Sequence, residues 1–219
     1  IVGYPKDVEE VYLSQEGIIN SASQNSYLID MTTTTPTLSI KIHEEAKKKN
    51  LKALDAPVSG GDIGAKNATL SIMVGGEKED FEACRKLFEA MGKTIVYAGN
   101  AGSGQHTKMA NQIAIAGVMA GVSEAIAYGK KMGLDIPTML ASISNGAAQS
   151  FHLTNNAPKM YKREFEPGFY IKHMVKDLKI ANEEMPNLKV LKDVLEIYET
   201  LEKNGDGDLG TQAICKYYE

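Results

Sequence analysis

The stretch Gly99-Asn-Ala-Gly-Ser-Gly104 divides the chain into two parts whose apolar residues follow different patterns. Before it, short apolar runs alternate with amphipathic helical patterns, which is typical of βα units. After it, a long helical stretch runs from Gln105 to about Met132, and the later apolar segments have helical spacing. The sequence therefore predicts an α/β domain over residues 1–100 and an all-helical domain over residues 101–219, joined by the long helix.

The expected elements follow from these patterns. In the first domain they are strands at 1–3, 27–31, 51–55, 70–74 and 94–97 and helices at 37–50 and 78–91. In the second domain, helical spacing covers residues 140–143, 175–185, 190–201 and 211–217. Asp135 and Pro137 mark the start of one helix, and Asp208 is expected to cap the last one.

Composition excludes several classes of partner. The 219 residues carry a formal net charge of -4, so a nucleic-acid surface is not expected. The two cysteines lie in unrelated contexts and the four histidines show no metal-ligand spacing, which predicts neither a disulfide framework nor a metal site. The most apolar stretch, 113–128, is too short and interrupted to span a bilayer, and the first residues show no export signal. We therefore expect a cytoplasmic protein.

The strongest candidate for chemistry follows the glycine loop. Lys108, Asn111 and Gln112 are spaced i, i+3 and i+4, so they share one face near the amino end of the long helix. The helix dipole and any desolvation would disfavour the ammonium form and lower the pKa of Lys108 toward the range of a general acid/base. Alternatively, Lys108 is an ordinary surface lysine at a helix start.

A second cluster follows the strand expected at 51–55. Ser59, Gly60 and Gly61 form a turn that exposes successive backbone amides and a hydroxyl, which together can bind a carboxylate. A tight structural turn explains the same residues.

Two further clusters are weaker. Asp30 is followed by Met31 and the four hydroxyls of 32–35, at a strand end where open α/β sheets bind ligands. Threonine before proline is also a helix cap. Lys176 and Asp177 say little by themselves.

Taken together and in this order, these clusters resemble the β-hydroxyacid dehydrogenase family, which includes 3-hydroxyisobutyrate dehydrogenases and tartronate semialdehyde reductases. The resemblance implies a Rossmann-type dinucleotide-binding domain, here partial, followed by a helical domain for substrate binding and dimerisation. It also implies NAD or NADP as cofactor. The implied roles are Lys108 as acid/base; Asn111 or Gln112 orienting the substrate oxygen; Ser59, Gly60 and Gly61 holding the carboxylate; and Pro5, Thr33 and Lys176 contacting the cofactor.

Three departures from the family pattern stand out. Thr32 replaces a serine that is common in the family, and Asn111-Gln112 replaces the paired asparagines of many relatives. The family's G-x-G-x-x-G fingerprint is absent from the 219 residues. Because residues 1–11 resemble the family's fourth strand and the helix after it, we expect roughly two βα units, on the order of 60 residues, to precede them. The choice between NAD and NADP belongs to that preceding part.

The implied reaction is the reversible oxidation of a small hydroxy acid, catalysed by a homodimer or homotetramer that binds neither nucleic acid nor a membrane. Asp208 and Gln212 indicate a polar substituent on the substrate. Three alternatives remain: a non-catalytic cofactor-binding or assembly relative, an imine reductase, and an inert helical assembly domain. Lys108 argues against the first and discriminates the second, since such relatives normally lack this lysine.

Overall fold

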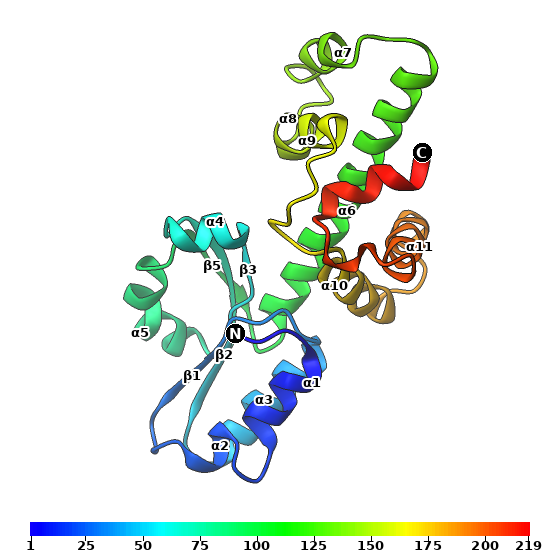
Figure 1. Ribbon diagram of the computed structural model, residues 1–219. Coiled ribbons are helices and arrows are strands. Elements are labelled where there is room, and N and C mark those ends of the chain that lie inside the picture. The colour runs from blue at the N-terminus through cyan, green and yellow to red at the C-terminus, as the bar shows by residue number, and fades with distance from the viewer. The chain divides into compact units, whose positions relative to one another are not determined.

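The structure, a computed structural model, describes residues 1–219 and divides into two compact units, Ile1–Ala110 and Asn111–Glu219 (Figure 1). The boundary falls inside the long helix α6 (Ser103–Lys131), whereas the sequence placed it in the glycine loop before that helix. The two units are described separately below.

The first unit is built on a five-stranded mixed sheet. The strands are β1 (Tyr27–Asp30), β2 (Lys52–Asp55), β3 (Val58–Ser59), β4 (Leu70–Gly75) and β5 (Gly92–Gly99). β1 is parallel to β2, and β4 is parallel to β5, but β4 is antiparallel to both β2 and β3. A parallel crossover needs a dozen or more residues, and the link between β3 and β4 is shorter than that, so the chain turns back instead.

Five helices belong to this unit together with the start of α6: α1 (Pro5–Leu13), α2 (Ile18–Ser21), α3 (Pro36–Lys48), α4 (Gly61–Lys66) and α5 (Lys78–Glu89). The start of α3 is encoded locally, because Thr35 Oγ1 accepts a hydrogen bond from the Leu38 amide at 3.2 Å and Pro36 takes the first helical position. Its last turn carries Lys47 and Lys48, which suits the negative end of the helix dipole.

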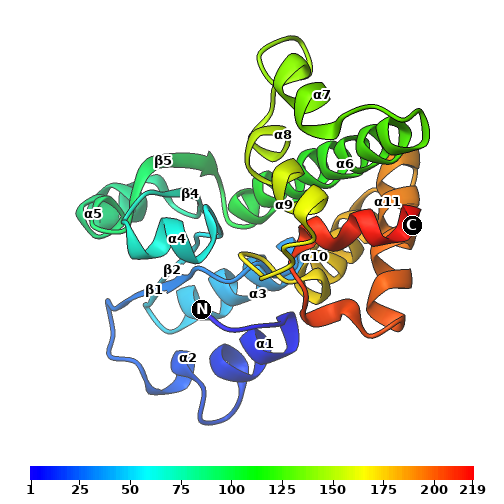
Figure 2. The same ribbon diagram turned by 45° about the horizontal axis from the view of Figure 1, so that its top comes forward.

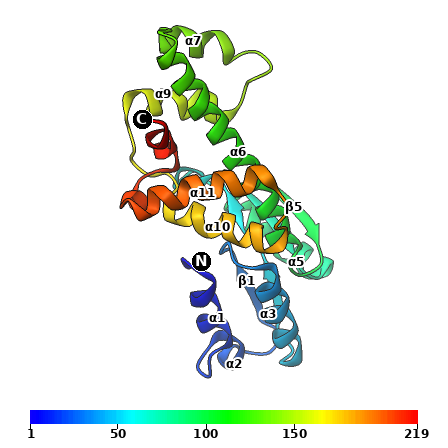
Figure 3. The ribbon, with the colours of Figure 1, turned by 90° about the vertical axis from the view of Figure 1, so that its right-hand side faces the viewer.

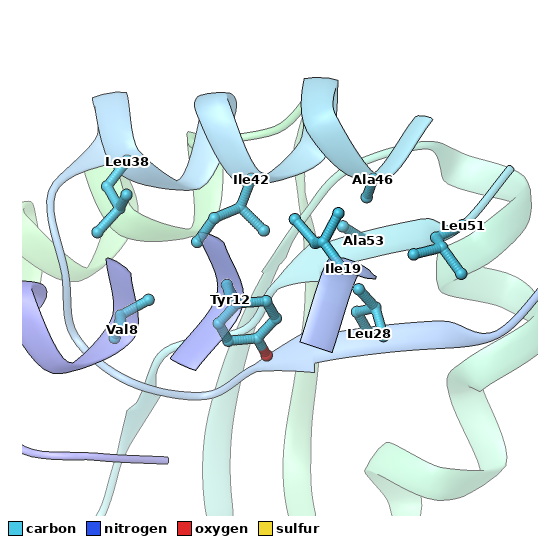
Figure 4. Packing of buried hydrophobic residues seen from close by; sticks show 9 residues of the cluster. All are labelled: Val8, Tyr12, Ile19, Leu28, Leu38, Ile42, Ala46, Leu51 and Ala53. Atoms are coloured by element: carbon cyan, nitrogen blue, oxygen red, sulfur yellow. The ribbon is translucent and has the colours of Figure 1, made fainter. Parts of the chain in front are cut away.

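Helices cover both faces of the sheet. Neighbouring residues of a strand point to opposite faces, and Ala53 and Leu54 of β2 accordingly belong to different apolar clusters. On one face, α1, α2 and α3 pack over β1 and β2 (Figure 4). On the other, Phe81, Cys84 and Phe88 of α5 pack against β2 and β4. The first cluster consists of Val8, Tyr12, Ile19, Leu28, Leu38, Ile42, Ala46, Leu51 and Ala53.

The second unit is helical, as expected. α10 and α11 run side by side, and a 3-10 helix, η2, packs against α9 and α11 (Figures 2 and 3). The fully buried Tyr198 of α11 donates its hydroxyl to the Thr211 carbonyl of η2 at 3.0 Å. Besides the rest of α6, the elements are α7 (Ile136–Ile143), α8 (Phe151–Asn155), α9 (Ala157–Lys162), α10 (Ile171–Glu184), α11 (Lys189–Lys203), η1 (Asp206–Asp208) and η2 (Thr211–Tyr218).

Two local predictions are wrong. Residues 1–3 form no strand, and the Val2 amide instead donates to Thr32 Oγ1 at 3.0 Å. Asp208 does not cap the last helix, because its carboxylate pairs with Lys172 at 2.6 Å and Gly210 takes the cap position.

The predicted long helix is present as α6, and it extends beyond the apolar stretch 113–128 at both ends. α6 has 29 residues, and its most apolar window has a mean hydropathy of 1.3. By length and composition alone, it is long enough to cross a membrane, a condition that core helices of soluble proteins also meet.

Candidate active site

Lys108 lies in the second turn of α6 and is 5% exposed. A buried ammonium is costly unless it has hydrogen-bond partners. Its Nζ donates to the carbonyl of Val58 at 2.8 Å. Because Val58 directly precedes Ser59, this contact places the amine beside the start of the Ser59-Gly60-Gly61 turn, within the first unit.

The turn itself is accessible. β3 ends at the half-buried Ser59, and the exposed Gly60 and Gly61 lead into α4. Gly60 has a φ of 129° and Gly61 a φ of 63°, a backbone path that favours glycine at both positions. Successive amides in such a path form a concave surface suited to a carboxylate. The turn is exposed at both glycines, and its substrate-carboxylate role stays a prediction.

Asp55 holds the amino end of α6 in place. Its Oδ1 accepts the Gly102 amide at 2.8 Å, and its Oδ2 accepts the Gln105 amide at 3.0 Å. Burial raises the pKa of Asp55, while these backbone amides oppose the rise. A carboxylate from the end of β2 thus caps the helix that carries Lys108.

Gly104 permits this close approach. A Cβ at this position would lie 2.4 Å from the Met73 carbonyl oxygen and 2.7 Å from Asp55 Oδ2. Only a residue without a side chain lets α6 begin this close to β2 and β4.

The loop after β1 presents its side chains alternately. Thr32 and Thr34 are buried, whereas Thr33 between them is half-buried. Asp30, which ends β1, accepts the Thr32 amide at 2.9 Å through Oδ1 and lies opposite Asp55 in the sheet register. Burial raises the pKa of Asp30. The predicted cofactor contact, Thr33, is therefore one of the partly accessible residues of this loop, together with Met31 and Thr35.

A buried polar chain occupies the second unit. Asn111 Nδ2 donates to Gln112 Oε1 at 2.8 Å, and Gln112 Nε2 donates to Asp177 Oδ2 at 2.7 Å. Lys176 Nζ lies 2.9 Å from Asp177 Oδ1. Gln112 and Asp177 are almost fully buried, while Asn111 is half-buried. These contacts join three predicted site residues, Asn111, Gln112 and Lys176. The connecting residue is Asp177, to which the sequence analysis assigned no role.

The structure thus gathers the predicted residues in two sets. In the first unit, Lys108 bonds the residue before the Ser-Gly-Gly turn, and Gln105 of the same helix bonds the loop that carries Thr33. In the second unit, Asp177 joins Gln112, and through it Asn111, to Lys176. Pro5 begins α1, and Val2, three residues earlier, donates to Thr32.

The expectation of a polar substrate substituent rested on two residues with intramolecular partners. Gln212 Nε2 donates to the carbonyls of Glu164 and Glu166 at 3.0 and 2.9 Å, and Asp208 pairs with Lys172. Neither contact adds support for that expectation.

Sequence reasoning assigned no role to Asp55, Gln105 or Asp177. Each is a polar residue in a buried element, and that contrast was the available signal. Their partners lie 47 to 73 residues away, so nothing local identified the contacts.

Known proteins share both parts of the chain. Residues 1–99 match the family described as the NAD binding domain of 6-phosphogluconate dehydrogenase. Residues 102–218 match the family described as the NAD-binding of NADP-dependent 3-hydroxyisobutyrate dehydrogenase. The chain belongs to the β-hydroxyacid dehydrogenase family. Its cofactor class is accordingly NAD or NADP.

Individual relatives match nearly the whole chain. The uncharacterized oxidoreductase YkwC of Bacillus subtilis is 56% identical over 100% of this chain and 77% of its own length. The probable 3-hydroxyisobutyrate dehydrogenase-like 1 of Arabidopsis thaliana is 43% identical over 98% of this chain and 65% of its own. A solved Mycobacterium tuberculosis 3-hydroxyisobutyrate dehydrogenase with L-serine has a TM-score of 0.90 at 26% identity, covering 99% of this chain and 77% of that one.

The residues present fit one part of a dinucleotide. Thr33 is half-buried in the loop at the carboxyl end of β1, and open α/β sheets in general bind ligands at the carboxyl ends of strands. The glycine-rich phosphate turn is not among the 219 residues.

Proposed function

We propose that this chain carries the catalytic residues of an NAD- or NADP-dependent dehydrogenase that interconverts a small β-hydroxyacid and its semialdehyde or keto form. The observation that supports this most directly is the buried Lys108 amine, 2.8 Å from the Val58 carbonyl and next to an accessible Ser-Gly-Gly turn. A proton-transfer group thereby adjoins a carboxylate-binding turn, as the reaction requires.

In this proposal, the hydroxyl of Ser59 and the amides of Gly60 and Gly61 hold the substrate carboxylate. Lys108 accepts the proton of the substrate hydroxyl during oxidation and returns it during reduction. When bound, the nicotinamide supplies or accepts the hydride. Thr33, Pro5 and Lys176 contact the cofactor.

Asn111 is the amide that we assign to the substrate oxygen. Both amides were candidates, but Gln112 is 2% exposed, and its two polar atoms already bind Asn111 and Asp177. Asn111 is only half-buried, and its Nδ2 rather than its side-chain oxygen makes the hydrogen bond to Gln112.

The test compares two lysines of the same helix in the intact protein. Lys108→Ala should lower kcat by on the order of 10²- to 10⁴-fold, as for a lost general acid/base. The Kd for NADH or NADPH should stay within about threefold, because the proposed role of Lys108 is toward the substrate. Lys131→Ala, at the exposed end of α6, should leave both quantities unchanged.

Turnover is followed by NADH or NADPH absorbance with a panel of semialdehydes. Near-normal turnover by Lys108→Ala would refute the proposed role. Cofactor binding without turnover by the unmodified protein would favour the non-catalytic alternative, and reduction of cyclic imines that survives Lys108→Ala would favour an imine reductase.

A further inference from the structure

Gln105 is a fully buried polar side chain in the first turn of α6. Its Nε2 donates to the Thr32 carbonyl at 2.8 Å, and its Oε1 accepts the Thr34 amide at 3.1 Å. The side-chain amide therefore bridges the two backbone groups on either side of Thr33. A neighbouring β-strand likewise offers one donor and one acceptor to the backbone beside it.

The orientation of this side-chain amide is settled by its partners. The Thr32 carbonyl can only accept and the Thr34 amide can only donate, so a flipped Gln105 would oppose like groups at both ends. Glutamine supplies one donor and one acceptor at this spacing and is uncharged, whereas glutamate and lysine, which are of similar size, carry a charge. Burying either partner unpaired would cost about 1–3 kcal/mol.

The backbone of Gln105 is tied to a third element. Its amide donates to Asp55 Oδ2 at 3.0 Å, which holds the start of α6 against the end of β2. Lys108 follows three residues later in the same helix. One residue thus fixes the loop that carries Thr33 relative to the helix that carries Lys108, entirely within the first unit.

We infer that Gln105 is a positioning residue that sets Thr33 for cofactor contact at a fixed place relative to Lys108. The inference rests on the proposed function, because it takes Thr33 as a cofactor contact. Gln105 is fully buried and both polar atoms of its side chain bond the backbone of the loop, so its proposed effect is exerted through Thr33.

The first measurement is independent of any cofactor. In Gln105→Leu, the Thr34 amide loses its acceptor, and its hydrogen exchange in the intact protein should become at least about tenfold faster. Gln24→Leu, at an exposed position before β1, is the matched control and should leave that amide unchanged. Unchanged exchange of the Thr34 amide in Gln105→Leu would overturn the bridge. If Gln105→Leu does not fold, Gln105→Met, which keeps the length of the side chain without its amide, should give the same faster exchange of the Thr34 amide.

The second measurement tests whether Gln105 affects cofactor binding through Thr33 or only by stabilising the fold. Kd for NADH or NADPH is measured by nicotinamide fluorescence for Gln105→Leu, Thr33→Val and the double variant. Each single change should raise Kd by roughly tenfold, about the loss of one hydrogen bond. Because Gln105 acts through Thr33, the Kd of the double variant should be about the same as the higher Kd of the two single variants.

The outcomes distinguish the inference from the function it rests on. If the two effects on Kd multiply while the unmodified protein binds and turns over normally, Gln105 does not act through Thr33 and the inference fails alone. If the unmodified protein binds neither NADH nor NADPH, the proposed function fails, and the cofactor role of Gln105 fails with it.

Discussion

Gly104→Ala tests the close approach of α6 to the sheet. The new Cβ would lie 2.4 Å from the Met73 oxygen and 2.7 Å from Asp55 Oδ2. Carbon–oxygen contacts of about 3.3 Å are ordinary, so the start of α6 must move by roughly 0.6–0.9 Å. The two hydrogen bonds to Asp55, at 2.8 and 3.0 Å, would then exceed the usual range.

The expected magnitude follows from those two bonds. Each hydrogen bond to a charged group is worth about 1.5–3 kcal/mol, and replacing glycine by alanine in a helix returns about 1 kcal/mol. The net loss in the free energy of unfolding is therefore roughly 2–5 kcal/mol, or about 5–15 °C in Tm for a chain of this size.

Gly121→Ala is the matched control in the same helix. Nothing lies within 4 Å of a Cβ added there, so the substitution should raise Tm by about 2–4 °C. Thermal and urea unfolding of the intact protein measure both variants. A Gly104→Ala protein as stable as the wild type would show that α6 does not begin against β2 and β4.

Two other changes test buried polar groups. Asp30→Asn removes a carboxyl whose Oδ2 has no hydrogen-bond partner and whose pKa is raised by burial. Below about pH 3.9 this carboxyl is protonated in both the folded and the unfolded protein. At higher pH it ionises less readily in the folded protein, because burial disfavours the charge. The wild-type free energy of unfolding should therefore fall relative to that of the variant as pH rises toward 7, and parallel pH curves from urea unfolding would contradict this. Gln212→Leu removes both amide contacts to the Glu164 and Glu166 carbonyls, which should cost about 1–3 kcal/mol. The exposed Gln149→Leu should cost almost nothing, and equal urea midpoints for the two variants would argue against the contacts.

Much of the element order could be predicted because its signals are local. Thr35-Pro36 starts α3, and Asp135 accepts the Thr138 amide at 3.0 Å to start α7, as its sequence indicates. The family was indicated by the resemblance of the ordered motifs around Lys108 to those of known members, whereas periodicity gave only the type of the elements that carry them. The direction of β4 could not be predicted from local signals, because strand pairing depends on which edge of the sheet the returning chain reaches.

The sequence by itself determined that helices and strands alternate up to the glycine loop, that a long helix follows, and which residue types could carry out the chemistry. Only the tertiary structure decided how they are held: Asp55 caps a helix 47 residues further on, and Gln105 bridges a loop more than 70 residues earlier. The same tertiary contacts enclose Gln112 and leave Asn111 accessible. Periodicity reports which face of an element is apolar, whereas the partner of a buried polar group depends on long-range packing that no local pattern encodes.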